Sequence, residues 1–157
     1  MSRLPPFPAE VQAPAELPLR AALLKGLTQA LPRDLFVVDL DPEGENLVTI
    51  PAKHPEVGDL TVCDFGDELV VHVGRLTHAH FANYDDSLSL ERKAEEIASQ
   101  VLDFVQAVLR DEIEIFGNGQ RGGHRERGLK PRGTLSRYFF GKKTYVWSGP
   151  LGDASDA

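Results

Sequence analysis

The sequence predicts an α+β domain in which an antiparallel β-meander sheet is covered on one face by a long amphipathic helix and flanked by an N-terminal helix. Short β-branched runs alternate with turn signals between residues 35 and 81. A long run with helical periodicity follows at 88–110, and a leucine stripe precedes the strands at 18–31. A chain of 157 residues that is 41% hydrophobic is long enough to bury a core as one domain.

The N-terminal residues 1–17 are expected to form an extended arm, because five prolines fall within the first eighteen residues. A helix then begins at Pro18 and ends before Pro32, with apolar residues at helical spacing: Leu19, Leu23, Leu24, Leu27, Ala30 and Leu31. The N-terminus has no uninterrupted apolar run, so we expect neither a signal peptide nor a membrane span and predict a cytoplasmic protein.

The strands are predicted as a first hairpin followed by a three-stranded meander, in an antiparallel sheet of about six to eight strands. Turn clusters rich in Gly, Asp and Pro separate the apolar runs. The predicted strands are 35–40, 47–50, 60–63, 68–73 and 76–81.

The turn after Val73 decides how the histidines of the meander are arranged. A two-residue loop would place Val73 opposite Leu76 and mix valines and histidines on both faces. A three-residue Gly74-Arg75-Leu76 loop would pair His72 with His78 and Val70 with His80. It would also gather His72, His78 and His80 on one face and place Leu69, Val71, Val73, Ala79 and Phe81 on the other. We favour the three-residue loop because it separates most of the apolar side chains from the histidines.

The long helix is predicted from Leu88 to about Arg110, capped by the segment 85–87. Its apolar residues fall in one arc of the helical wheel, which should cover the sheet: Leu90, Ala94, Ile97, Ala98, Val101, Leu102, Phe104, Val105, Val108 and Leu109. A short strand is expected at 112–116, where the pattern begins to alternate.

Residues 117–133 contain six glycines and no apolar periodicity, so the sequence predicts a long flexible loop. The match to G-x-G-x-x-G at 117–122 is a chance one, since no helix follows to receive a pyrophosphate. A final hairpin is predicted from 135–140 and 144–147, and 151–157 form a loose tail. The single domain therefore spans 18–150.

The charge is unevenly distributed. The net charge is −7, yet residues 117–143 hold eight basic residues against Glu126 alone, so the remainder of the chain carries −14. Either this segment docks on its own acidic body or it meets an anionic partner. The candidates for partner or anion binding are Arg121, Arg125, Arg127 and Arg132. Nucleic acid is not expected, because an acidic body repels phosphates.

Two features of the sequence are candidate chemical sites. His72, His78 and His80 could hold a divalent metal such as zinc, with Asp85 or Asp86 as a fourth ligand or as a hydrogen-bond partner of a ligand. They could instead be polar residues of a half-exposed sheet face, or a pH-sensitive contact or general base. Cys63, the only cysteine, can form no internal disulfide and is expected to be a buried small side chain.

The run HAHFANYDDSLSLERKAEEIASQVLDFVQAVL, followed by a glycine-rich segment and YVWSGPL, resembles small uncharacterised bacterial proteins, some of them immunity partners of secreted toxins. The resemblance implies a bacterial cytoplasmic protein. We expect a non-catalytic domain that binds another protein, of the inhibitor, immunity or chaperone type, with no cofactor and no membrane contact. The alternative is a metal-dependent hydrolase built on the three histidines.

Overall fold

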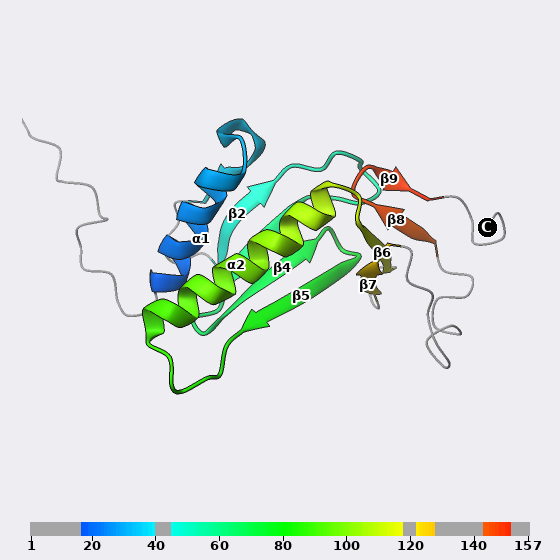
Figure 1. Cartoon of the computed structure of the whole chain (residues 1–157). Helices are drawn as coiled ribbons and strands as arrows, with labels where there is room; N and C mark the ends of the chain where they lie inside the picture. The colour runs from blue at the N-terminus through cyan, green and yellow to red at the C-terminus, as the bar shows by residue number, and fades with distance from the viewer. Residues whose placement is uncertain (1–16, 40–44, 118–121, 128–142, 152–157) are drawn as a thin grey trace, which may run out of the picture.

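The computed structural model describes residues 17–39, 45–117, 122–127 and 143–151, and it confirms the α+β class. Two helices lie across one face of a five-stranded antiparallel sheet, and a second, smaller sheet follows the long helix (Figure 1). The predicted arm, the strand at 135–140 and most of the predicted tail lie outside the described residues. Within the described part of the chain, no helix is long and apolar enough to cross a membrane.

The larger sheet, sheet A, contains five strands in the order of the sequence, all antiparallel. Its strands are β1 Val37–Val38, β2 Asn46–Ile50, β3 Leu60–Asp64, β4 Glu68–Val73 and β5 Thr77–Ala82. The predicted strand at 35–40 is shorter than expected, because Arg33–Leu35 form a 3-10 turn in which Leu35 N–H donates to the Pro32 carbonyl at 3.0 Å. The other four strands lie where the sequence predicts them.

The helices α1 Leu17–Ala30 and α2 Leu90–Leu109 cross close to each other over the core. At the crossing, Gly26 of α1 faces the side chain of Leu102 of α2. Ser89, and not the predicted segment 85–87, caps α2: its hydroxyl accepts from Arg92 N–H at 3.1 Å. The carboxylate of Asp85 instead closes the preceding turn by accepting from Ser87 N–H at 3.0 Å.

The strand period of two separates the faces of sheet A. One cross-strand row faces the helices and is largely apolar: Val38, Val48, Val62, Val71 and Ala79. The adjacent row points the other way: Val37, Thr49, Thr61, His72 and His78. Val48, Val62 and Val71 are at most 1% exposed, whereas Val37 is 59% exposed, so the core lies on the helix side of the sheet.

The second sheet, sheet B, follows α2 and has the strand order β7-β6-β8-β9. Its strands are β6 Ile113–Gly117, β7 Gly122–Glu126, β8 Thr144–Val146 and β9 Gly149–Pro150. The loop predicted across 117–133 is therefore wrong for 122–126, which pair with all five residues of β6. The strands form two sheets where the sequence predicts one.

A close contact fixes sheet B against sheet A. A side chain at Gly117 or Gly122 would overlap the carbonyl oxygen of Leu76, in the turn between β4 and β5. Only glycine permits this close approach of the two backbones. The close approach therefore accounts for glycine at these two strand positions.

Candidate functional site

The face of sheet A opposite the helices, here called the open face, carries the cross-strand row from Val37 to His78 together with Glu68, His80 and Val70, of which Val70 is buried at 2% exposed. The three-residue turn predicted after Val73 is confirmed, because Val73 pairs with Thr77, His72 with His78 and Val70 with His80. The three predicted histidines therefore lie together on one face. His78 and His80 are exposed and His72 is half-buried.

The imidazole rings are neighbours. The ring centroids of His72 and His78 lie 5.6 Å apart, and those of His78 and His80 lie 5.1 Å apart with their planes at 75°. Burial lowers the pKa of His72, and the nearby His78 and His80 lower it further. Both effects favour the neutral form of His72.

Glu68 is a member of this group that the sequence analysis did not single out. Both of its carboxylate oxygens lie 3.2 Å from Nδ1 of His80. Glu68 pairs with Ala82, so it lies diagonally opposite His80 on the same face. Alternate residues of a strand share a face, so the spacing of Glu68 from Val70 and His72 could have identified it as a member of this group.

A fourth histidine, His124 of β7, lies on the helix side of β5. Its Nδ1 is 3.5 Å from the Thr77 hydroxyl and its ring meets Phe104 edge-on at 5.0 Å. These contacts shield the ring although the residue as a whole remains exposed. Burial lowers the pKa of His124, and the charge of His78 adds to the effect.

Among the described residues, no three His, Cys, Asp or Glu side chains converge closely enough to hold a metal ion as they stand. Asp85 and Asp86, predicted as further ligands, make other contacts. Asp85 accepts from the Ser87 hydroxyl at 2.6 Å, which lowers the pKa of Asp85, and Asp86 lies 3.8 Å from Lys93 of α2.

Cys63 is 5% exposed on the same side of β3 as Thr61, and its thiol donates to Asn46 Oδ1 at 3.1 Å. Burial raises the pKa of this thiol, with a smaller contribution from the charge of Glu45. A raised pKa lowers the fraction of thiolate, so the expected role as a small buried side chain is confirmed.

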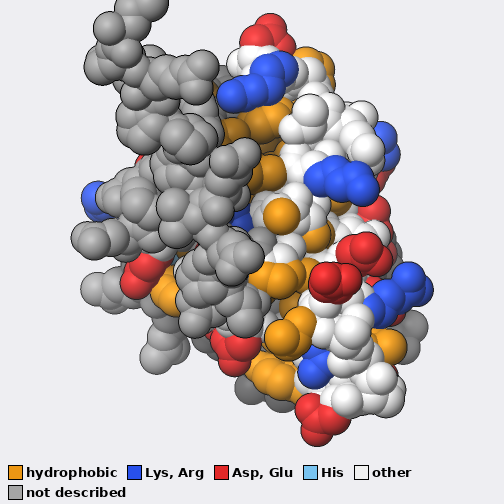
Figure 2. Space-filling view, turned by 90° about the vertical axis from the view of Figure 1, so that its left-hand side faces the viewer, with side chains coloured by type: hydrophobic (Ala, Val, Ile, Leu, Met, Phe, Trp, Pro, Cys, Tyr) orange, Lys and Arg blue, Asp and Glu red, His pale blue; other side chains and the backbone are white. Residues whose placement is uncertain are grey.

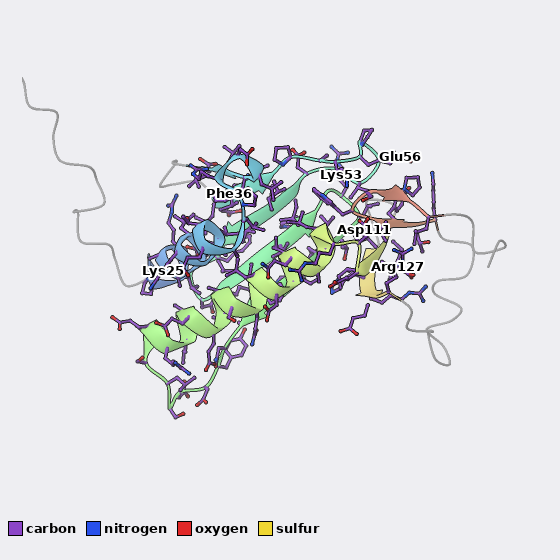
Figure 3. All side chains as sticks on the ribbon, turned by 45° about the horizontal axis from the view of Figure 1, so that its top comes forward. Lys25, Phe36, Lys53, Glu56, Asp111 and Arg127 are labelled. Atoms are coloured by element: carbon purple, nitrogen blue, oxygen red, sulfur yellow. The ribbon has the colours of Figure 1, made fainter. Side chains whose placement is uncertain are left out.

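The basic residues of the described part of the 117–143 segment contact the acidic body. Arg125 of β7 lies 2.7 Å from Glu114 of the neighbouring strand, and Lys143 lies 3.0 Å from Glu56. Arg127 donates to the backbone carbonyl of Asp111 at 3.4 Å, and Figure 3 shows both residues at the end of α2. Arg121 and Arg132 lie outside the described residues.

A shallow groove of about 520 Å³ lies between the two helices, on the other side of sheet A from the histidines. Its lining combines small residues, among them Ala22, Gly26 and Ala98, with the charged Lys25, Glu91 and Glu95. Figure 2 shows the side of the molecule where α1 and the first turns of α2 lie, with hydrophobic side chains exposed among acidic and basic ones.

No protein-family model matches the chain, and no curated protein or solved structure shows significant similarity to it.

Proposed function

We propose that the chain is a non-catalytic domain that binds another protein, of the inhibitor, immunity or chaperone type, and that its open face is the binding surface. One observation carries the proposal. A single row of accessible side chains, from Val37 through Thr49, Thr61 and His72 to His78, crosses all five strands of sheet A.

The composition of this row suits protein recognition. It combines an exposed aliphatic side chain, two hydroxyls and imidazoles on a regular sheet, whose opposite face is covered by the two described helices. A protein surface can bury such a mixture while pairing the hydroxyl and imidazole groups by hydrogen bonds. The helix-side core does not depend on these side chains, so they are free to serve a partner.

The charge of the molecule favours a basic partner. Within the described residues, the carboxylates of Glu56 and Glu114 pair with Lys143 and Arg125, which belong to the basic segment. The exposed carboxylates of Glu45 and Asp67 directly precede β2 and β4, two strands of the open face. An acidic surface accelerates and orients the binding of a basic protein.

The alternative, a metal-dependent hydrolase, stays a prediction. The groove between α1 and α2 is separated from the three histidines by sheet A. A hydrolase would need its substrate next to the metal ligands, and this groove cannot provide that. The binding function is therefore the one that the arrangement of the described residues favours.

The test begins with capture of partners from the organism that encodes the chain, followed by titration of the purified partner against wild type and two variants. Thr61→Arg places a large cation in the middle of the open face. Gln29→Arg adds the same charge on exposed α1 and serves as the control.

Thr61→Arg should weaken the affinity by about tenfold or more, and Gln29→Arg should leave it within about twofold. Circular dichroism checks that both variants are folded. The proposal fails if the partner binds both variants equally well, or if no stoichiometric partner is found.

A further inference from the structure

The ring centroids of the three histidines of the open face are spaced like those of ligands to one ion, although the side chains do not converge on a common point as they stand. Two imidazoles bound to the same tetrahedral zinc, at Zn–N distances of about 2.0–2.1 Å, have ring centroids about 5 Å apart. The observed centroid separations are 5.6 Å between His72 and His78 and 5.1 Å between His78 and His80. His78 lies between the other two, which places all three rings around one region of the surface.

The contact between Glu68 and His80 is a second and independent observation. An ionised carboxylate can only accept hydrogen bonds, so the proton of His80 must reside on Nδ1, 3.2 Å from both oxygens of Glu68. The lone pair of the ring is then on Nε2. A carboxylate that fixes the tautomer and orientation of a histidine in this way is typical of metal ligands.

The ligands are accessible and need only side-chain rotation. His78 and His80 are exposed, and 55% of the His80 side chain is accessible. The rings are now tilted or edge-on to one another, at 38° and 75°. Exposed side chains change rotamer readily. A shared ion requires the rings of His72 and His78 to turn toward Nε2 of His80 while Nδ1 of His80 stays beside Glu68.

We propose that His72, His78 and His80 bind one divalent transition-metal ion of the zinc or nickel class on the open face, with Glu68 as the residue that orients His80. Imidazole is a favoured ligand for both ions. Three protein ligands leave a tetrahedral ion one position for water or for a donor from another molecule. This site goes beyond the protein-binding function and does not require it.

The test is titration of the full chain, free of any affinity tag, with zinc and with nickel at neutral pH by calorimetry. Wild type should bind one ion saturably. His78→Ala should weaken the affinity by about tenfold or more, since it removes the central ligand. His54→Ala is the control, because His54 lies in the connection between β2 and β3, against Gly149 of β9.

Glu68→Gln tests the orienting residue and keeps all three ligands. It should weaken metal binding by about 10–100-fold, the usual effect of removing such a carboxylate. Thermal unfolding without metal checks that each variant is folded. The proposal is overturned if wild type shows no saturable binding, or if His78→Ala binds as tightly as His54→Ala. If only the Glu68 effect is missing, the orienting role is wrong.

Discussion

Ser148 donates two hydrogen bonds to the carboxylate of Asp111, from its backbone N–H to Oδ1 at 2.9 Å and from its hydroxyl to Oδ2 at 2.5 Å. Asp111 follows α2 and has a φ of 60°, the left-handed conformation. Its N–H donates to the Val108 carbonyl at 3.0 Å, and the next N–H donates to the Ala107 carbonyl at 2.9 Å. This is a Schellman motif with Asp in the position that usually holds Gly. Asp111 thus ends α2 and also binds the turn between β8 and β9.

Substitution of Asp111 separates its two roles. Asp111→Ala loses both bonds to Ser148 and keeps a side chain in the left-handed conformation, so it should lower the free energy of unfolding by about 2–4 kcal/mol. Asp111→Gly loses the same bonds but suits the backbone, and should be about 1 kcal/mol less destabilised than the alanine variant. Urea unfolding measures both. A glycine variant less stable than the alanine variant would show that the left-handed conformation at this position does not strain a residue with a side chain.

The contact between the two sheets gives a second prediction. Gly122→Ala would push a methyl group into the carbonyl oxygen of Leu76, a backbone atom that cannot move alone, and should cost about 1–3 kcal/mol. Gly26→Ala is the matched control. Its methyl group meets only the end of the Leu102 side chain, and Ala favours a helix over Gly by about 1 kcal/mol. The stability of this variant should therefore change by less than about 1 kcal/mol. Equal losses in chemical denaturation would argue against the contact with Leu76.

Patterns within a few residues were enough to predict sheet A and the position of the three histidines. The alternation of Leu69, Val71 and Val73 with His72 leaves one register in which these three valine and leucine side chains face the helices, while Val70 lies on the open face with the histidines. The same alternation predicts which histidines are neighbours. What it cannot predict is the rotation of each ring, because that depends on neighbours such as Glu68 that come from the adjacent strand.

The strand β7 could not be predicted because its glycines give no strand signal and part of its packing comes from residues far away in the sequence. Gly122 and Gly123 give no strand signal, and they pack against Leu76 and the ring of Phe116, respectively. His124 likewise acquires its environment from Phe104 of α2. Although β7 pairs with the neighbouring β6, its contacts with Leu76 and Phe104 cannot be read from the segment alone, which therefore looks like a loop.

The stability of the protein should depend on the protonation of His124. Its pKa is lowered in the folded state, first by burial against Thr77 and Phe104 and then by His78. As pH falls through the range below about 6.5, the unfolded chain binds this proton more readily than the folded one, so the free energy of unfolding decreases. Above that range both states are neutral at this residue and its contribution is constant.

His124→Phe removes the titrating group and keeps an aromatic ring against Phe104. The decrease in unfolding free energy between pH 7.5 and pH 5 should be smaller in this variant than in wild type, measured by urea unfolding at each pH. Part of the decrease should persist, because the pKa of His72 is also lowered. A variant with the full pH dependence of wild type would show that His124 does not titrate differently on folding.

The ion pair between Glu114 and Arg125 should stabilise sheet B far more than an exposed pair on α2 does. Both Nε and Nη2 of Arg125 lie 2.7 Å from Oε2 of Glu114, and the side chains are only 24% and 14% exposed, respectively. A double-mutant cycle with alanine at each position should give a coupling of about 1–3 kcal/mol. The pair Arg92 with Glu96 is the control: it is 3.6 Å apart and its side chains are 63% and 40% exposed. Its coupling should be at most about 0.5 kcal/mol.

Because water screens only the exposed pair strongly, 1 M salt should abolish the coupling on α2 and leave most of the coupling in sheet B. Equal couplings, or equal losses in salt, would mean that the pairing of Arg125 with the acidic body contributes no more than a surface contact.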